Sequence, residues 1–349
     1  MSYESSSANY SPEKTDYQAQ LLKNRLTKRF QHLKKWARRS DVGCYRLYDK
    51  DIPEIPLAID IFFMQESPSA SEAETYLRIY LYQRPYEKDE KEETAWLEAM
   101  IQAAAQVVGV SQDKVVAKTR MRQRGSDQYE KQETQDSITG IVQEQGHKFF
   151  VNLSNYLDTG LFMDHRPLRK IVEQEAQGKA VLNLFCYTAS FSVYAAAGGA
   201  SRVDSVDLSN TYLAWGEKNF SLNGFTDTEK YRFTRSDVTQ FLKDSRDSWD
   251  IIVLDPPTFS NSKKTKDTLD INRDWPKLVN VAIQHLNPGG TLYFSTNSRQ
   301  LHFDEGLLKL PAKENDGAQL AVKDITAATI PEDFRNQKIH RCWKITLPK

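Results

Sequence analysis

The chain has 349 residues, which is enough for two domains with a sizeable core. Its 47 lysines and arginines balance its 47 aspartates and glutamates, and 39% of its residues are hydrophobic, which argues against a disordered protein. Three widely spaced cysteines, Cys44, Cys186 and Cys342, argue against a disulfide framework or a zinc site, so no metal is expected. The start of the chain lacks an apolar signal segment and no stretch is long enough to cross a membrane, so we expect a cytoplasmic protein without a membrane partner.

The N-terminal part of the chain combines a polar tail with a basic helix. Residues 1–20 predict a flexible tail. Apolar residues then recur at helical spacing over 21–39, beside a face without acidic residues. A second basic run covers 118–124. Both runs are expected to contact phosphates, although a solvated charged face is the equal alternative for each. The candidate contacts are Lys34, Lys35, Arg38, Arg39, Arg120 and Arg122.

Residues 21–152 predict a small α+β module. Strand character is found at 44–48, 57–65, 76–82, 115–122 and 138–152, with a helix at 94–108. The last strand segment is expected to form a hairpin that turns near Gln145 and Gly146. We summarise the order of this module as strand-strand-helix-strand-strand.

Residues 153–349 predict an α/β domain, because short strands alternate with helices. The predicted strands are 181–186, 202–207, 231–234, 249–254, 290–295 and 343–347, and the predicted helices are 191–197, 209–223, 238–244 and 275–286. Such alternation is typical of a mostly parallel sheet with helices on both faces, and ligands of such sheets bind beyond the carboxyl ends of the strands.

The strand at 249–254 ends in the most informative motif of the chain. Asp255 is followed by Pro256 and Pro257, which restrict the backbone and present the carboxylate in a narrow range of geometries. Phe259 offers a flat ring for stacking on a base. This pattern is typical of the catalytic loop of an S-adenosylmethionine (SAM)-dependent methyltransferase that acts on nucleic acid. The plain alternative is a strand that ends in a proline-rich turn.

A candidate cofactor site precedes this loop. The turn at 185–192 lacks the GxGxxG motif that a pyrophosphate requires, which disfavours a dinucleotide oxidoreductase but suits SAM, a cofactor without phosphates. Asp207 is expected to accept the ribose hydroxyls, Asp237 the adenine amino group, and Arg166 is expected to bind the methionine carboxylate. Helix capping or surface roles for the two aspartates, and pairing of Arg166 with Asp164, are the alternatives. The other candidate cofactor contacts are Asp158, Asn183, Phe185, Tyr187, Thr188, Leu208, Ser209 and Asp255, and His165 is expected to be structural or gating.

Segments spread over residues 21–349 resemble the C-terminal half of the bacterial bifunctional ribosomal RNA large subunit methyltransferases K/L, which form N7-methylguanosine in 23S rRNA. The most specific match runs from Asp255 to Lys263. The resemblance implies a class I SAM-dependent methyltransferase fold, Rossmann-like with a mostly parallel seven-stranded sheet, after a small RNA-binding subdomain. It also implies free or pre-ribosomal 23S rRNA as the partner, and a separate N-terminal guanine-N2 methyltransferase half as a further candidate partner. The family usually has glycine where this chain has Ala189, and we expect the extra methyl group to narrow the space beside the methionyl group.

The chemistry of the loop favours guanine N7 as the methylated atom. N7 carries an in-plane lone pair and needs orientation rather than a general base, whereas cytosine C5 requires a cysteine nucleophile and the Asp255 loop contains none. Asp255 is expected to align the guanine edge, Phe259 to stack on the extruded base, and Lys263 and Asn297 to contact base or phosphate. Guanine-N2 or cytosine-C5 methylation of rRNA and a non-catalytic RNA-binding assembly factor remain the alternatives.

Overall fold

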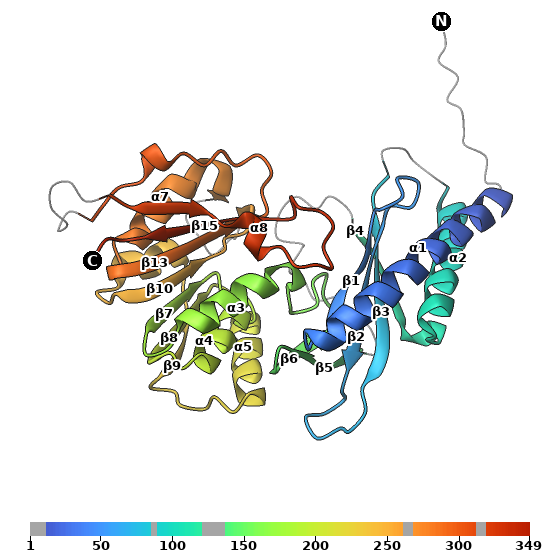
Figure 1. Cartoon of the computed structure of the whole chain (residues 1–349), viewed down its shortest axis with the longest axis horizontal. Coiled ribbons are helices and arrows are strands. Elements are labelled where there is room, and N and C mark those ends of the chain that lie inside the picture. The colour runs from blue at the N-terminus through green and yellow to red at the C-terminus, as the bar shows by residue number, and fades with distance from the viewer. Residues whose placement is uncertain (1–11, 85–88, 121–136, 261–267, 312–318) are drawn as a thin grey trace, which may run out of the picture. The chain divides into compact units, whose positions relative to one another are not determined.

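The computed structural model describes residues 12–84, 89–120, 137–260, 268–311 and 319–349, except the side chain of Arg120. The chain divides into two compact units, which are drawn in Figure 1 and are described separately. The first unit contains the described residues up to 146 and the segment 153–157. The second unit contains residues 147–152 and the described residues from 158 onward.

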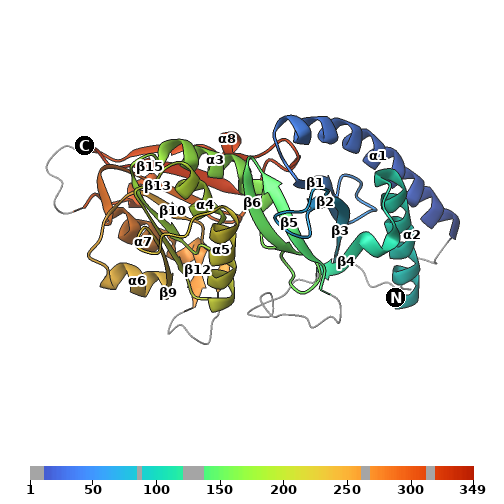
Figure 2. The same cartoon turned by 90° about the horizontal axis from the view of Figure 1, so that it is seen from below.

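The first unit consists of a four-stranded sheet with two long helices. Its elements are α1 (Pro12–Arg39), β1 (Cys44–Asp49), β2 (Leu57–Met64), β3 (Glu74–Tyr82), α2 (Glu90–Val108), the 3₁₀ turn η1 (Gln112–Lys114), β4 (Val115–Arg120) and β5 (Thr139–Glu144). The sheet order is β1-β2-β3-β4, antiparallel except for the parallel pair β3–β4. Helices α1 and α2 pack side by side and their apolar residues form one core with the sheet (Figures 1 and 2).

Two predictions for this unit were wrong in detail. Helix α1 begins at Pro12, so residues 12–20 are not part of a tail, and Pro12 occupies the first helical turn, where its missing N–H costs nothing. After α1, the order along the chain is strand-strand-strand-helix-strand-strand rather than strand-strand-helix-strand-strand, because a third strand, β3, precedes α2. The predicted hairpin is confirmed, since β5 and β6 (His147–Asn152) form a two-stranded sheet around Gln145 and Gly146.

The boundary between the units differs from the predicted boundary after residue 152. Hydrogen bonds tie residues 147–152 to the second unit and residues 153–157 to the first. Strand β6 belongs to the second unit, where the side chain of Asn219 accepts from the Phe150 backbone N–H at 2.9 Å. The segment 153–157 belongs to the first unit, where buried Arg78 donates to the backbone carbonyls of Leu153 and Tyr156. Within the described residues 137–260, the chain therefore crosses between the units three times, after residues 146, 152 and 157.

The second unit is an α/β fold. After β6 come η3 (Met163–His165), α3 (Arg166–Glu175), β7 (Ala180–Leu184), α4 (Ser190–Ala197), β8 (Arg202–Asp207), α5 (Asn210–Leu222), β9 (Tyr231–Arg235), α6 (Val238–Asp244), β10 (Trp249–Leu254), β11 (Phe259–Ser260), β12 (Leu269–Asp270), α7 (Ile271–Ile283), β13 (Leu286–Thr296), η4 (Glu305–Leu307), β14 (Ala321–Asp324), α8 (Thr326–Thr329) and β15 (Arg341–Thr346).

The seven-stranded sheet of this unit has the order β14-β15-β13-β10-β7-β8-β9. Strands β9, β8, β7, β10 and β13 are parallel, and β15 runs antiparallel to both of its neighbours. Helices α3, α4 and α5 contact one another on one face and α6 contacts α7 on the other (Figures 1 and 2). The predicted mostly parallel seven-stranded sheet is thus confirmed. The strand order reverses between β7 and β10, and ligands of such sheets bind at that point.

Several elements of the second unit were not predicted from the sequence, among them α3, α8 and β14. Strand β14 is short and largely exposed, so its sequence carries no apolar pattern. Helix α7 begins at Ile271 rather than Trp275, because Asp270 caps it through the Asn272 N–H at 3.0 Å, while Pro276 lies inside the helix. None of the helices in the described part of the chain combines the length and apolar content that a membrane crossing requires.

Candidate active site

The turn between β7 and α4 has an unusual backbone. Phe185, Tyr187 and Ala189 have φ values of 55°, 50° and 59°, a region that costs a residue with a side chain about 1–2 kcal/mol. The turn is held by its neighbours, since the Tyr187 N–H donates to Asp207 and the Thr188 hydroxyl donates to the Gly160 carbonyl at 2.6 Å. Strain of this kind persists where the surroundings determine the backbone, and it clusters at ligand sites.

Asp207 ends β8 beside this turn. One carboxylate oxygen accepts from the Tyr187 N–H at 3.0 Å and the other from the Ser209 N–H at 2.9 Å. Burial raises the pKa of Asp207 above its usual range, although hydrogen bonds from the backbone of Ser209, Tyr187 and Leu208 oppose the shift. Ser209, a predicted cofactor contact, caps α5 by accepting from the Tyr212 N–H. Asp207 is therefore a fixed, half-buried acceptor at the sheet edge where the ribose was predicted.

The other acidic candidates are less sharply defined. Asp237 caps α6 by accepting from the Gln240 N–H at 2.9 Å, which was the alternative role considered for it. A carboxylate has about four acceptor sites, so capping leaves room for the adenine contact, which stays a prediction. Asp158 and Leu208 are half-buried, and their cofactor contacts stay predictions too.

Three predicted cofactor contacts are instead buried supports of the site. The Arg166 guanidinium, 2% exposed, pairs with the fully buried Asp333 carboxylate at 2.9 Å, so we withdraw its assignment to the methionine carboxylate. The Asn183 amide donates to the Ser192 hydroxyl at 2.8 Å inside the sheet–α4 contact. Thr188 is fully buried and bonded to Gly160 as described above. These side chains hold the turn in shape.

Aromatic rings surround the turn. The Tyr187 ring lies 5.1 Å from Phe162 and 4.5 Å from Tyr212 between centroids. Phe162 is 41% exposed. Phe185 is half-buried and packs against the core between the sheet and α7. The turn thus presents an apolar wall next to the Asp207 carboxylate.

The Asp255 loop follows β10 at the same edge of the sheet. The half-buried Asp255 carboxylate accepts from the Ser295 hydroxyl of β13 through one oxygen, and its other oxygen lies 3.4 Å from His165 Nε2. Pro256 is buried and Pro257 half-buried, which fixes the path of the loop. Phe259 lies in β11 and is 49% exposed, so its ring is available for stacking.

Asn297 lies beyond the end of β13, next to this loop. Its side-chain oxygen accepts from the Thr258 hydroxyl, and the residue is exposed. Two further predicted RNA contacts, Lys263 and Arg122, lie outside the described residues, as does the side chain of Arg120.

Two cysteines lie near the site, and both are poor nucleophiles. Burial and the nearby Asp255 carboxylate raise the pKa of Cys342 well above its usual range, and burial together with Asp207 does the same for Cys186. Cys342 faces Ser295 across the β13–β15 ladder, which the distance along the sequence did not reveal. Since the thiolate is the nucleophile, neither side chain suits covalent attack on a base.

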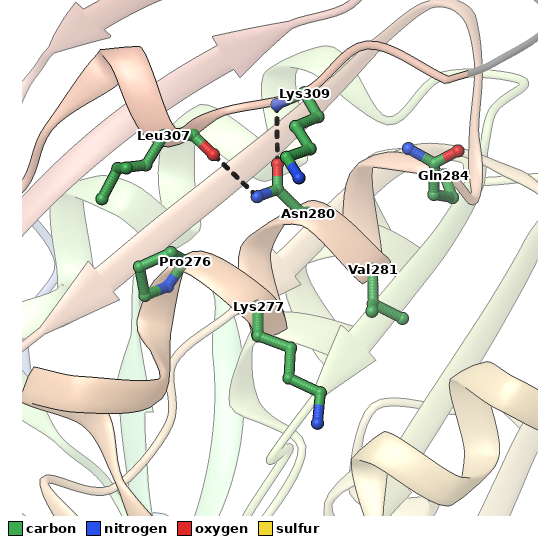
Figure 3. A pocket seen from close by; sticks show the side chains of 7 residues that line it. All are labelled: Pro276, Lys277, Asn280, Val281, Gln284, Leu307 and Lys309. Carbon is green, nitrogen blue, oxygen red and sulfur yellow. Dashed lines mark hydrogen bonds between the residues drawn. The ribbon is translucent and has the colours of Figure 1, made fainter.

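The basic face of α1 has the expected exposure. Lys34, Lys35, Arg38 and Arg39 are all exposed, whereas Leu33 and Ala37 are buried in the core of the first unit. A separate groove lies along α7 and the segment around Leu307, and Figure 3 shows Asn280 bonded there to the Leu307 carbonyl and the Lys309 N–H. No predicted site residue lines this groove.

The strand order, with acidic residues at the carboxyl ends of β8 and β10, is that of a class I methyltransferase fold. The chain belongs to the S-adenosylmethionine-dependent methyltransferase family, whose model matches residues 66–329, and within it to the ribosomal RNA large subunit methyltransferases K and K/L.

Two relatives and one solved structure carry this assignment. The chain is 45% identical over 326 residues to "Ribosomal RNA large subunit methyltransferase K" of Neisseria meningitidis serogroup B, with 92% of this chain and 86% of that protein covered. It is 46% identical over 328 residues to "Ribosomal RNA large subunit methyltransferase K/L" of Pseudomonas fluorescens. This match covers 94% of this chain but only 40% of the length of that relative. SMU.776, described as a methyltransferase complexed with SAH, matches with a TM-score of 0.68 and 22% identity over 94% of this chain and 82% of its own, which supports the fold.

The residues at the sheet edge fit the SAM cofactor. The β7–α4 turn has no glycine-rich phosphate nest, while Asp207 is a fixed acceptor for hydroxyl groups beside the apolar ring of Tyr187. When bound, the cofactor supplies an electrophilic methyl group. The residues that sequence reasoning missed are Ser295, Cys342 and His340, all of which reach the site from elements distant in sequence.

Proposed function

We propose that this chain transfers the methyl group of SAM to guanine N7 in 23S rRNA of the large ribosomal subunit. The names of its relatives support large-subunit rRNA as the substrate. The K/L relatives extend well beyond the matched region, so a separate guanine-N2 methyltransferase half is a proposed partner.

The observation that carries the choice of N7 is the environment of the Asp255 carboxylate. Each oxygen already faces one fixed neighbour, Ser295 on one side and His165 on the other, and each keeps one further acceptor site. Two parallel acceptor sites match the N1–H and N2 amine donors of a guanine edge. Such a contact orients the base, and N7 needs only orientation because its lone pair carries no proton.

The neighbouring residues weaken the two alternative reactions. Methylation at cytosine C5 requires a thiolate, and the raised pKa values of Cys342 and Cys186 oppose one. Methylases of exocyclic amines often hold the amine with a Tyr after the two prolines. The corresponding residue is Thr258, whose hydroxyl donates to Asn297. We therefore favour N7 over guanine N2.

RNA is expected to dock on the first unit through α1. The four exposed cations of its basic face follow one another within two turns, so they present a continuous positive strip to a phosphate backbone. A base inside an RNA duplex must leave the stack before it reaches the Asp255 loop, and the exposed Phe259 ring is placed to stack on it.

Transfer of a labelled methyl group from SAM to unmodified 23S rRNA tests the proposal. The wild-type chain should label 23S rRNA and leave 16S rRNA unlabelled. Asp255→Asn should lower transfer by roughly a hundredfold, as small misplacements of a reacting base do, while Asp247→Asn, an exposed aspartate before β10, should match wild type. Equal labelling by Asp255→Asn would remove Asp255 from the reaction.

A further inference from the structure

A buried cluster behind the Asp255 loop is not used by the reaction as described so far. We propose that His165 is a positioning residue, which holds the Asp255 carboxylate in the orientation that recognises the base, and that Asp164 and His340 hold His165 in turn. This inference rests on the proposed function, because it assigns a role relative to Asp255.

His165 is buried, and its ring faces the Asp255 carboxylate. Its ring is 6% exposed, and Nε2 lies 3.4 Å from the Asp255 Oδ2 atom and 3.8 Å from Asp164 Oδ2. The ring stacks on His340 at 4.5 Å between centroids and 12° between planes, and it makes an edge contact with Phe191 at 5.8 Å between centroids and 61° between planes. Because the imidazole is buried and packs against His340 and Phe191, it has little freedom to turn away from Asp255.

His340 fixes the second half of the cluster. Its Nδ1 lies 3.0 Å from Asp164 Oδ2, and its Nε2 lies 2.9 Å from the Thr329 hydroxyl oxygen. The ionised Asp164 carboxylate can only accept, so Nδ1–H of His340 is the donor to Asp164, and Nε2 is left to pair with the Thr329 hydroxyl. Asp164 therefore accepts from a fully anchored ring.

The position of the proton on His165 follows from its surroundings. Burial lowers the pKa of His165, despite the two nearby carboxylates, so the ring is neutral and carries one proton. Nε2 faces the Asp255 and Asp164 carboxylates, whereas the buried Nδ1 has no hydrogen-bond partner among the described residues. The proton belongs on Nε2, where it is aimed at acceptors, and His165 is then a donor toward Asp255.

Metal binding is the alternative role for this cluster, since donor atoms of Asp164, His165 and His340 all lie within 4.8 Å of one another. An ion bound to an imidazole nitrogen lies in the plane of that ring at about 2.0–2.1 Å. The two rings are stacked in nearly parallel planes, so in-plane bonds from both nitrogens do not meet at one point. The ring geometry thus favours a hydrogen-bonded support over a metal site.

Nitrogen NMR of the histidine rings tests the proton position without any turnover. The chain has six histidines, and loss of one signal in His165→Gln assigns His165. We expect a neutral Nε2–H ring whose nitrogen shifts change in Asp255→Asn and stay unchanged in Asp247→Asn. An Nδ1–H ring, or no response to Asp255→Asn, would overturn the proposal whether or not the protein methylates RNA.

Steady-state kinetics test the positioning role. His165→Leu removes the donor and should lower kcat roughly tenfold or more, with an unchanged Kd for SAM and an unchanged melting temperature. His165→Gln keeps an N–H at similar reach and should restore kcat to within about threefold of wild type. The matched control is His147→Leu, which removes another histidine that faces a carboxylate (Glu173, 3.1 Å) and an aromatic ring (Tyr194, 4.4 Å), and it should leave kcat unchanged.

The outcomes separate this inference from the proposed function. If wild type methylates 23S rRNA but His165→Leu keeps its kcat, or if the Leu and Gln variants lose kcat and melting temperature equally, His165 has no positioning role. If wild type fails to methylate 23S rRNA, the proposed function falls, and the NMR result alone decides the contact between His165 and Asp255.

Discussion

The methyl group of Ala189 lies against Gly216 of α5, and neither position has room to spare. A Cβ added at Gly216 would lie 2.9 Å from the Ala189 Cβ and 2.9 Å from a ring carbon of Phe233. Ala189 is fully buried. The Ala189 side chain therefore fills space beside α5.

Gly216→Ala should destabilise the folded protein by about 1–3 kcal/mol, because it overpacks the Ala189–Phe233 contact. Denaturant unfolding measures the loss. Adding Ala189→Gly should recover part of it, since the second change removes one of the two opposing methyl groups, whereas Ala189→Gly alone should leave SAM affinity within about twofold of wild type. Strictly additive effects of the two substitutions would contradict the contact.

Asp207→Ala should weaken SAM binding by about 1.5–3 kcal/mol, the scale of hydrogen bonds to a charged group. Calorimetry of the pure protein measures the affinity directly. Asp227→Ala, which removes an exposed carboxylate that also accepts from the backbone, is the control and should bind SAM as wild type does. Unchanged affinity of Asp207→Ala would take Asp207 out of the cofactor site.

The same carboxylate makes SAM binding pH-dependent. Because burial raises the pKa of Asp207, the carboxylate takes up a proton at a higher pH than an ordinary aspartate does. SAM affinity should be complete above this raised pKa and should fall as the pH is lowered through it. The decline should be missing from Asp207→Ala, and its persistence there would assign it to another group.

Replacing Lys34, Lys35, Arg38 and Arg39 with Gln should lower RNA affinity and flatten its salt dependence, by roughly one unit of log–log slope for each lost phosphate contact. Filter binding over a range of salt concentrations measures both. The charge-matched control replaces four exposed lysines of the second unit with Gln, and it should change the salt slope less. These lysines are Lys243, Lys309, Lys323 and Lys338. An unchanged slope in the first variant would make the α1 face a solvated or protein-binding surface.

Phe259→Ala should slow methyl transfer by raising the transition-state free energy by about 1–3 kcal/mol, which is the value of base stacking on an aromatic ring. SAM affinity should not change. Leu307→Ala is the matched control, because Leu307 is 47% exposed and Phe259 49%, so both substitutions remove a comparable exposed apolar group. Equal rates for the two variants would show that Phe259 does not stack on the substrate.

The strand ends were predictable from the sequence, and the partners of the side chains on them were not. Asp207 ends the strand at 202–207 and Asp255 follows the largely apolar strand at 249–254, so the alternation of strands and helices puts both at one sheet edge. His165 and Ser295 reach Asp255 from elements far away in the sequence. Periodicity within one segment carries no information about such contacts.

The wrong predictions have the same origin. The start of α1 looks like a polar tail, yet buried Gln18 accepts from the Trp96 indole N–H of α2 at 2.6 Å, a contact that only the packed unit shows. The Arg166 guanidinium can bind a carboxylate, and in the structure it pairs with the carboxylate of Asp333, from the C-terminal part of the chain. In both cases a distant partner decided the role of a polar side chain.

Mass spectrometry of nucleosides from 23S rRNA, methylated by the pure chain and then digested, tests the central claim most directly. The structure-based account predicts N7-methylguanosine, because Asp255 orients a guanine edge and the nearby thiols of Cys342 and Cys186 are protonated. The product should disappear with Asp255→Asn and persist with Asp247→Asn. N2-methylguanosine or 5-methylcytidine in its place would contradict the assignment.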